Sequence, residues 1–430
     1  MPRAFFFPSY LGSGFGHVGR CLALAGELSA RGWEVAFALS GPHLARVHAA
    51  GYPVYEPKKP FRPRAETREG PAFTIFSDMN FQLVRDGFHH PRVVRATVKE
   101  GLRFVERFKP DVLVGDTWPL TSVLGRLTGL PVVQIIKSVV HPARPNLIWW
   151  EPPPPGLLSP DPRPVFNPVL RRWGLPEIAR AEDLLTGDLL LVPSIPELDP
   201  LPPDLPDTYY VGALVASDGA SAQEPPWFAD LDVSRPLLYV TIGGGAGPVG
   251  SRCFFTLVAE AFADTVWQVI VSTSAKFSPA DLPVPPPNVR FESWVPGLAV
   301  IARSDVVMFH GGYGTTMECV RCGVPSVVIP FHSEQESNGR RLEASGAGLV
   351  LLPSSSPPQA VPGRWGGGKF VTLIRRASDL TALQLRQAVE EVWTHESYRQ
   401  NAERLRDKLA HYGGPAQAAE LIEILVAQRT

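Results

Sequence analysis

The sequence predicts an α/β protein with two Rossmann-like, parallel-sheet domains that face each other across a cleft. Two observations support this prediction. With 430 residues, the chain is long enough for two domains of ordinary size. Both halves also repeat the order strand, glycine-containing turn, helix and strand, which is typical of parallel sheets with right-handed crossovers.

Composition excludes several classes of protein. The formal charge is −1 and the pI is about 6.8, so nothing indicates a nucleic-acid partner. The apolar run near the N-terminus is too short for a signal peptide, and no apolar stretch is long enough to span a membrane. We therefore expect a cytoplasmic protein. Peripheral membrane contact and the oligomeric state stay open.

The four cysteines predict neither a metal site nor a redox site. Cys319 and Cys322 form a C-x-x-C pair, but a zinc site needs a second pair and the chain has none. Small apolar residues one helical turn apart are typical of a packed core. Free thiols also fit a reducing compartment.

The first half begins with an apolar strand at residues 4–7, a glycine-rich loop at 8–16 and a helix from His17. Residues 33–39 form the next strand. Gly12, Gly14 and Gly16 are spaced G-x-G-x-G instead of G-x-G-x-x-G, and no acidic residue ends the second strand. These two features argue against a nicotinamide enzyme, and we expect the loop to make room for an acceptor beside His17.

Residues 51–100 predict a long irregular segment with scattered aromatic residues. It either forms part of an acceptor pocket or simply packs over the sheet. Strands follow at 111–115, 132–136 and 188–193, the last of which should end the first sheet. Asp116 comes directly after one of these strands. Because ligands bind beyond the carboxyl ends of parallel strands, Asp116 and His17 are expected to meet.

Residues 209–226 lack periodicity and predict the interdomain linker. A second sheet starts with the strand at 237–242. Gly243 and Gly244 open a glycine run, which is either a flexible loop or a place where backbone approaches a phosphate or ribose. Further elements are a helix at 253–263 and strands at 267–272 and 289–291. Trp294 either stacks on a nucleobase or packs in an interface.

The stretch from residue 306 to 338 predicts a diphosphate site. A strand at 306–309 leads through His310 and Gly311-Gly312 into a helix that opens at Gly314, is capped by Thr315 or Thr316, and ends at Gly323. Free N–H groups and the helix dipole make such a turn an anion site. The two glycines leave no side chain to hold a ligand off the backbone.

Carboxylates and an amide surround this predicted anion site. Glu318 lies on the helix, where it could accept hydrogen bonds from a ribose hydroxyl pair. A strand at 327–329 and a polar loop follow, and Glu334 and Gln335 in that loop could hold sugar hydroxyls. Residues 354–369 predict a long loop without a catalytic role. Helices at 380–393, 398–411 and 416–427 end the chain.

These motifs resemble those of the GT-B glycosyltransferases that use nucleotide sugars, especially the macrolide and plant natural-product group. The family pattern matches Trp294-Val295-Pro296, His310-Gly311-Gly312-Tyr313-Gly314-Thr315, Glu318, Pro330 and Glu334-Gln335. The family Gln that follows this Pro, and that helps to read the base, is Gly297 here. The resemblance implies an acceptor-binding domain at 1–212, a donor-binding domain at 213–395, and helices at 396–430 that pack back onto the first domain.

The implied reaction moves a sugar from UDP or TDP to a hydroxyl group of a small lipophilic or natural-product acceptor. Neutral His17 is suited to take the acceptor proton, and Asp116 to orient its ring. The segment Gly16-His17-Val18 matches the family's catalytic histidine. The resemblance further implies inversion at the anomeric carbon, with neither a metal nor a cofactor beyond the nucleotide sugar.

Two other functions stay open from the sequence. A silent nucleotide-sugar binder would keep the donor motif and lose the base, whereas both His17 and Asp116 are present. A hydrolase or epimerase of the same fold is the other alternative, because Arg20 replaces a usual family proline and resembles nucleotide-sugar hydrolases in this respect.

Overall fold

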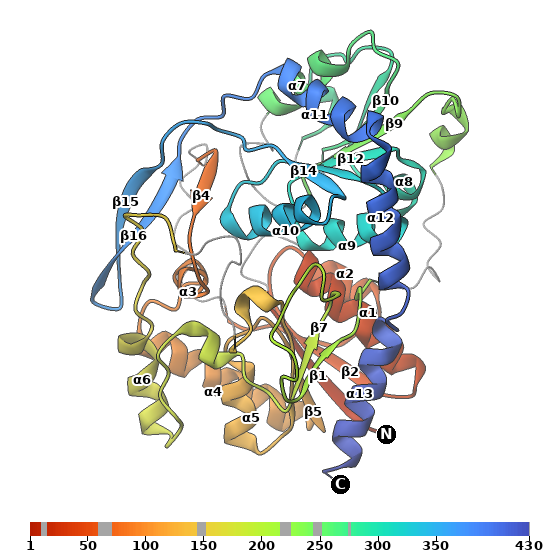
Figure 1. Cartoon of the computed structure of the whole chain (residues 1–430). Coiled ribbons are helices and arrows are strands. Elements are labelled where there is room, and N and C mark those ends of the chain that lie inside the picture. Colours follow the sequence, from red (N-terminus) through yellow and green to blue (C-terminus); the bar gives the residue numbers. More distant parts are fainter. Residues whose placement is uncertain are drawn as a thin grey trace.

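The computed structural model describes residues 1–9, 15–58, 71–143, 152–215, 225–243, 252–273 and 277–429. Two parallel sheets, each flanked by helices, form the two ends of the molecule, and a small antiparallel sheet lies beside them (Figure 1). The predicted α/β fold with two parallel-sheet domains is thereby confirmed. Within the described residues, no helix is long and apolar enough to cross a membrane.

The first sheet has the strand order β3-β2-β1-β5-β6-β7-β8, and all of its pairs are parallel. Its strands are β1 (Arg3–Pro8), β2 (Glu34–Ala38), β3 (Val54–Tyr55), β5 (Val112–Asp116), β6 (Val132–Ile135), β7 (Leu189–Val192) and β8 (Thr208–Tyr210). Around it lie α1 (Gly16–Ala30), α2 (Leu44–Ala49), α3 (Asn80–Arg85), α4 (Pro91–Phe108), α5 (Thr121–Thr128) and α6 (Arg163–Arg172).

The central strands of this sheet are buried along their length, which is why they read as unbroken apolar runs. The prediction that residues 188–193 end the sheet is wrong. The short strand β8, at the start of the predicted linker, adds one more parallel strand beside β7. Residues 51–100 are also less irregular than predicted, since they hold β3, β4 (Phe73–Ile75), α3 and the start of α4.

The second sheet has the order β11-β10-β9-β12-β13-β14, again parallel throughout. Its strands are β9 (Leu237–Thr241), β10 (Gln268–Ser272), β11 (Val289–Glu292), β12 (Val306–Phe309), β13 (Ser326–Val328) and β14 (Gly348–Val350). Its helices are α7 (Arg252–Phe262), α8 (Gly297–Arg303), α9 (Tyr313–Cys322), α10 (Ser333–Ala344) and α11 (Ala382–Thr394).

The loop predicted at residues 354–369 is instead most of a β-hairpin. β15 (Gln359–Trp365) pairs with β16 (Gly368–Arg375) around Gly366 and Gly367. Both glycines have positive φ, 56° and 87°, as a two-residue type I′ turn requires, and that turn matches the twist of the strands. β16 then pairs with β4, so this third sheet joins the second half of the chain to the first.

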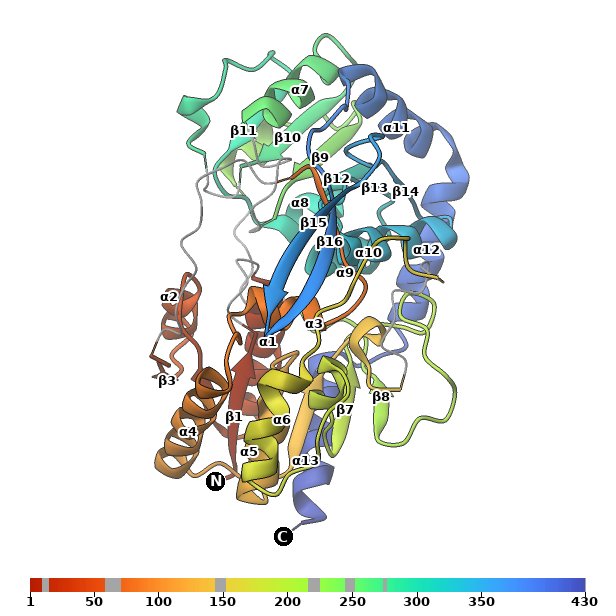
Figure 2. The same ribbon diagram turned by 90° about the vertical axis from the view of Figure 1, so that its left-hand side faces the viewer.

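The C-terminal helices run along both halves of the molecule (Figures 1 and 2). α12 (Glu396–Leu409) packs on α9, and α13 (Pro415–Ala427) packs on α1. Ala418, Ala419 and Ile422 of α13 belong to the hydrophobic core of the first sheet. The last helix therefore returns to the half in which the chain begins.

A buried ion pair joins the two halves between the sheets. Arg341 of α10 donates to Asp199, with Nη1 2.6 Å from Oδ1, and to the Ser138 hydroxyl, with Nη2 3.0 Å from Oγ. Ser138 itself donates to Asp199 through its N–H and its hydroxyl. All three residues are buried. A charge in such a place must be paired, so this contact fixes the separation of the halves.

We expect Arg341→Met to lower the free energy of unfolding by about 3–5 kcal/mol, because it leaves the buried Asp199 carboxylate unpaired. The neighbouring Arg340 is a matched control. The Arg340 side chain is 32% exposed and that of its closer partner Glu343 is 36% exposed, while its contact with the buried Glu336 is longer, at 3.4 Å, so Arg340→Met should cost less than about 1 kcal/mol. Urea denaturation measures both, and equal losses in the two variants would contradict the assignment.

Candidate active site

The carboxyl ends of the central strands supply the candidate site. In the first sheet the strand order reverses at β1 and β5, and Pro8 lies opposite Asp116 in the register. In the second sheet it reverses at β9 and β12, where Thr241 lies opposite Phe309. Ligands of open parallel sheets bind at such switch points. Residues that follow these four strands are therefore expected to face a ligand.

His17 and Asp116, which the sequence predicts to meet, are in contact. His17 Nδ1 lies 2.7 Å from Asp116 Oδ1. Arg20, one helical turn after His17 on α1, holds both oxygens of the same carboxylate, with Nε 2.8 Å from Oδ2 and Nη2 2.7 Å from Oδ1. The sequence marked Arg20 only as a departure from the family pattern. The structure gives it a bidentate ion pair with Asp116.

This arrangement selects one tautomer of His17. Two unprotonated acceptors would repel each other at 2.7 Å, so Nδ1 carries the proton and donates it to Asp116. Nε2 is left as an acceptor. Burial alone would raise the pKa of Asp116, but the charge of Arg20 and the hydrogen bonds from His17 and Arg20 hold it below its usual value. The carboxylate is ionised and keeps the ring in place.

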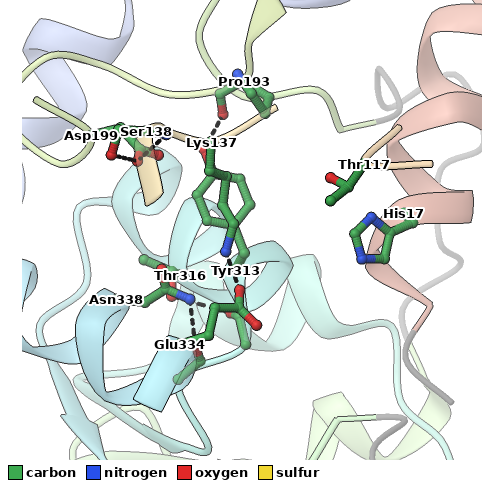
Figure 3. Close-up of polar contacts among 12 residues, drawn as sticks. His17, Thr117, Lys137, Ser138, Pro193, Asp199, Tyr313, Thr316, Glu334 and Asn338 are labelled. Atoms are coloured by element: carbon green, nitrogen blue, oxygen red, sulfur yellow. Dashed lines mark hydrogen bonds and ion pairs between the residues drawn. The ribbon is translucent and has the colours of Figure 1, made fainter. Parts of the chain in front are cut away.

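A cavity of about 330 Å³ opens beside His17 and reaches both halves of the chain. Its lining combines polar groups with apolar side chains from α3 and β16 and from the segments that follow β4 and β6, including Phe76, Met79, Phe81, Val139, Val140 and Phe370. Glu334, from the second half, lies on the same cavity. Figure 3 shows His17 and Thr117 on one side, with Lys137, Tyr313 and Glu334 across from them.

Glu334 lies in the first turn of α10, not in the predicted polar loop. Its carboxylate forms an ion pair with Lys137, which follows β6 in the first half (Figure 3). Burial tends to raise its pKa, but the charge of Lys137 and its hydrogen bond hold the pKa of Glu334 well below its usual value. A permanently charged acceptor therefore faces the cavity, and 37% of its side chain remains accessible.

Tyr313, which sequence reasoning passed over as the variable position of the glycine motif, joins the two halves. Its ring packs against Lys137, with Nζ 5.1 Å from the ring centre, and against Arg20, with Cζ at 5.4 Å. Its hydroxyl donates to the Pro193 carbonyl at 2.5 Å. Cations over an aromatic face are attracted to it. The start of α9 is thereby held against the residues that surround His17.

The glycines beside His310 make room for protein atoms. A Cβ on Gly243 would lie 2.4 Å from His310 Cε1, and one on Gly312 would lie 2.3 Å from its Nε2. A Cβ on Gly311 would lie 2.5 Å from the Gln335 carbonyl oxygen. Gly314 differs, because nothing lies within 4 Å of the Cβ position. Of these four glycines, Gly314 alone borders open space.

Helix α9 begins at Tyr313 with Gly312 as its N-cap, so the predicted cap at Thr315 or Thr316 is wrong. Thr316 turns its hydroxyl back to the Gly312 carbonyl, 3.1 Å away. Since no side chain of the described residues caps the helix, its first N–H groups are available to an anion. The helix ends at Gly323, in the left-handed conformation, as predicted.

The other predicted donor residues differ in which of their groups a ligand can reach. Trp294 is 61% exposed, and its ring is available to a ligand, whereas the Val295 side chain is buried in the core, so only its backbone can reach one. Gln335 accepts the Phe331 N–H through its carbonyl oxygen, which leaves its NH₂ group for a ligand. Gly244 lies outside the described residues.

Glu318 lies on α9 next to Gly297. Burial raises the pKa of Glu318 to about 7. A Cβ on Gly297 would lie 3.9 Å from Glu318 Oε2, which is ordinary van der Waals contact, so this glycine leaves space where the family has a glutamine. In the described part of the chain, no group of three or more His, Cys, Asp or Glu residues could hold a metal ion.

Comparisons with known proteins identify the family. Residues 257–363 match the family model "Erythromycin biosynthesis protein CIII-like, C-terminal domain". The chain is 30% identical, over 413 residues, to a PGL/p-HBAD biosynthesis rhamnosyltransferase of Mycobacterium bovis; this covers 91% of the chain and 81% of the relative. The chain belongs to the macrolide-type GT-B glycosyltransferases.

The similarity to solved glycosyltransferase structures extends over the whole chain or nearly so. The calicheamicin glycosyltransferase CalG4 superposes with a TM-score of 0.73 and 22% identity, covering 100% of both chains. The spinosyn rhamnosyltransferase SpnG, solved in complex with thymidine diphosphate, gives a TM-score of 0.68 and 22% identity, covering 99% of this chain and 100% of that one. At this identity the likeness establishes the fold.

Two glycine variants separate packing from ligand approach in this glycosyltransferase. Gly312→Ala should lower the free energy of unfolding by about 1–3 kcal/mol, because the new methyl group collides with His310. The new methyl group of Gly314→Ala enters open space on a helix, so the free energy of unfolding should rise by about 0.5–1 kcal/mol. Its affinity for UDP or TDP should nevertheless fall, because the methyl group projects where a phosphate would approach.

Thermal unfolding and calorimetric titration with UDP and TDP measure the two effects. Unchanged nucleotide affinity in Gly314→Ala would show that no ligand approaches this backbone. Unchanged stability in Gly312→Ala would show that His310 has another place to go.

Proposed function

We propose that this glycosyltransferase moves a sugar from UDP or TDP to a hydroxyl group of a small lipophilic acceptor, with inversion and without a metal or a further cofactor. One observation supports the proposal above the others. A single cavity is lined by His17 from the first half, whose Nδ1 is taken by Asp116, and by the charged Glu334 from the second. A base for the acceptor and an acceptor of sugar hydrogen bonds therefore face the same space.

In the proposed reaction, the acceptor oxygen gives its proton to His17 Nε2 as it bonds to the anomeric carbon. The bond from that carbon to the diphosphate oxygen breaks, and its electron pair leaves with the diphosphate. Asp116 stabilises the imidazolium ion that forms. Inversion follows because the nucleophile enters on the face opposite the leaving group in one displacement.

The leaving diphosphate gains negative charge, and groups of this chain can stabilise it. We propose that the uncapped start of α9 provides N–H groups for the phosphates and that His310 donates to them. Glu318 would hold the ribose, and Trp294 would stack on the base. The neighbour that was solved with thymidine diphosphate supports TDP as one donor nucleotide.

We also propose the division of labour that the sequence predicts: acceptor binding by residues 1–212, donor binding by 213–395, and helices at 396–430 that link the two. The apolar side chains of the cavity support a lipophilic acceptor. The contact between His17 and Asp116 argues against a silent nucleotide-sugar binder, since such a protein has no need of an oriented base.

His17→Ala should reduce the rate of sugar transfer by about 10²–10⁴-fold, because it removes the general base. Affinity for UDP and TDP should stay within twofold, since His17 lies on the acceptor side of the cavity. His48→Ala, at an exposed position on α2, is the control. Transfer is measured by chromatography with a panel of nucleotide sugars and phenols. A near wild-type rate for His17→Ala would refute its role as the base.

Nucleotide affinity should depend on pH through Glu318. Its pKa is raised to about 7, whereas ribose hydroxyl groups bind the ionised carboxylate. Affinity should thus be constant above about pH 7 and fall below it, by up to about tenfold per pH unit, because a proton must then be displaced. Glu318→Gln should bind more weakly and lose this dependence. Calorimetry between pH 5.5 and 8.5 tests it; a wild-type curve that stays flat would exclude Glu318.

A further inference from the structure

The β15–β16 hairpin follows the second sheet in sequence but lies largely against the first half of the chain (Figure 2). β16 pairs with β4, where Leu373 lies opposite Ile75. Farther along the same strand, Val371 and Leu158 exchange both backbone hydrogen bonds, at 2.9 and 3.1 Å. Trp365 is only 5% exposed and packs in the core of the first sheet.

The tip of the hairpin is also held in place. A Cβ on Gly366 would lie 2.7 Å from Val165 Cγ2 of α6, so the turn lies directly on that helix. Farther along, the Ala72 N–H donates to the Arg376 carbonyl at 3.2 Å. With partners along its length, the hairpin has one defined position, which a specificity element needs.

Side chains alternate across β16, and two of them line the cavity beside His17. Phe370 and Thr372 face it, whereas Leu373 packs on the other side with Phe73 and Ile75. The Phe370 ring lies edge-on to that of Phe81, 6.0 Å between centres at 84°. Segments far apart in the sequence therefore build one aromatic wall.

A third ring extends this wall toward the second half. Phe76, directly after β4, lies 6.1 Å from Phe81 and 5.5 Å from the His332 ring. The backbone at Phe76 is tied to α10, since its N–H donates to Ser333 Oγ at 3.0 Å. Glu334 is the next residue of that helix and lines the same cavity. The wall thus runs from the hairpin to the carboxylate on the proposed sugar side.

We infer that the β15–β16 hairpin is the specificity-determining wall of the acceptor site, and that Phe370 and Thr372 select a flat aromatic alcohol or phenol. This inference rests on the proposed function. Offset or edge-on ring contacts favour a planar aromatic ligand over a bulky aliphatic one. The cavity of about 330 Å³ is near the lower end of the range for small-molecule sites, which suits an acceptor of a few fused rings.

A purely structural hairpin would need no side chain in the cavity, since Trp365, Leu373 and its backbone pairs already hold it to the first half. Phe370 contributes to the core only in part and presents the rest of its ring to the cavity. Lys369, the preceding residue, is exposed and belongs to the same strand, so it provides a matched control. Phe370 faces the cavity, whereas Lys369 is exposed to solvent.

The test is a fluorescence titration of the full chain with umbelliferone, a flat two-ring phenol, in the presence of saturating UDP or TDP. Phe370→Ala should weaken its binding by about tenfold or more, because one face of the wall is lost. Thr372→Phe should weaken it similarly by filling the cavity. Lys369→Ala should stay within twofold of wild type. Thermal unfolding and nucleotide affinity show whether each variant is folded.

If Phe370→Ala and Thr372→Phe bind umbelliferone as Lys369→Ala does, the hairpin has no part in acceptor choice. If the wild-type chain does not bind umbelliferone, the flat aromatic class is refuted. For a Phe370→Ala protein that does not fold, Phe370→Leu keeps the bulk without the ring and answers the same question. Failure of the proposed function would look different: umbelliferone would bind, but no nucleotide sugar would give a transfer product.

Discussion

A buried negative charge organises the centre of this molecule. The Asp116 side chain has no accessible surface, and a carboxylate in such a place is stable only when cations and hydrogen-bond donors surround it. Arg20 occupies both oxygens, and His17 shares one of them. The position and the tautomer of the histidine follow from this pairing. Because the Arg20 guanidinium also packs on Tyr313, the same charge reaches the second half of the chain.

Three of the side-chain contacts between the two halves differ in how accessible they are to solvent. The Arg341–Asp199 pair is fully buried and has little freedom to separate. The Tyr313 ring packs against two cations, and its hydroxyl donates to a backbone carbonyl. The pair of Lys137 and Glu334 borders the cavity and remains partly accessible, so a ligand can exchange places with one partner. The firm contacts lie away from the cavity and the replaceable one lies on it, as a substrate site between domains requires.

The glycines around His310 serve two purposes: some allow close packing of protein atoms, and one leaves room for a ligand. Gly243, Gly311 and Gly312 are required because His310 and the Gln335 backbone occupy the space that their side chains would fill. His310 in turn stacks on Phe331, with 5.8 Å between ring centres. This packing holds the turn before α9 in one conformation, and a helix start so held presents its N–H groups without further ordering. Gly314, which borders open space, is the member of the motif that a ligand would meet first.

The sequence by itself determined the fold class, most strands of both sheets, and the family. Each of these depends on local signals: apolar runs, glycine turns, and motif spacing along one segment. It also brought His17 and Asp116 together, because strand ends in a parallel sheet share an edge. The turn at Gly366 and Gly367 is a local signal as well, because two glycines between two strands predict a two-residue type I′ turn.

Only the tertiary structure decided the partners that come from distant segments. Nothing near Arg20 in the sequence indicates that it holds Asp116, and nothing near Lys137 indicates Glu334. Nor does the hairpin sequence name β4 as its neighbour, because an edge strand pairs through backbone groups that every residue carries. Side-chain pattern specifies which face of an element is buried. The choice of the element that covers it depends on how the whole chain closes, and here that choice built the cavity.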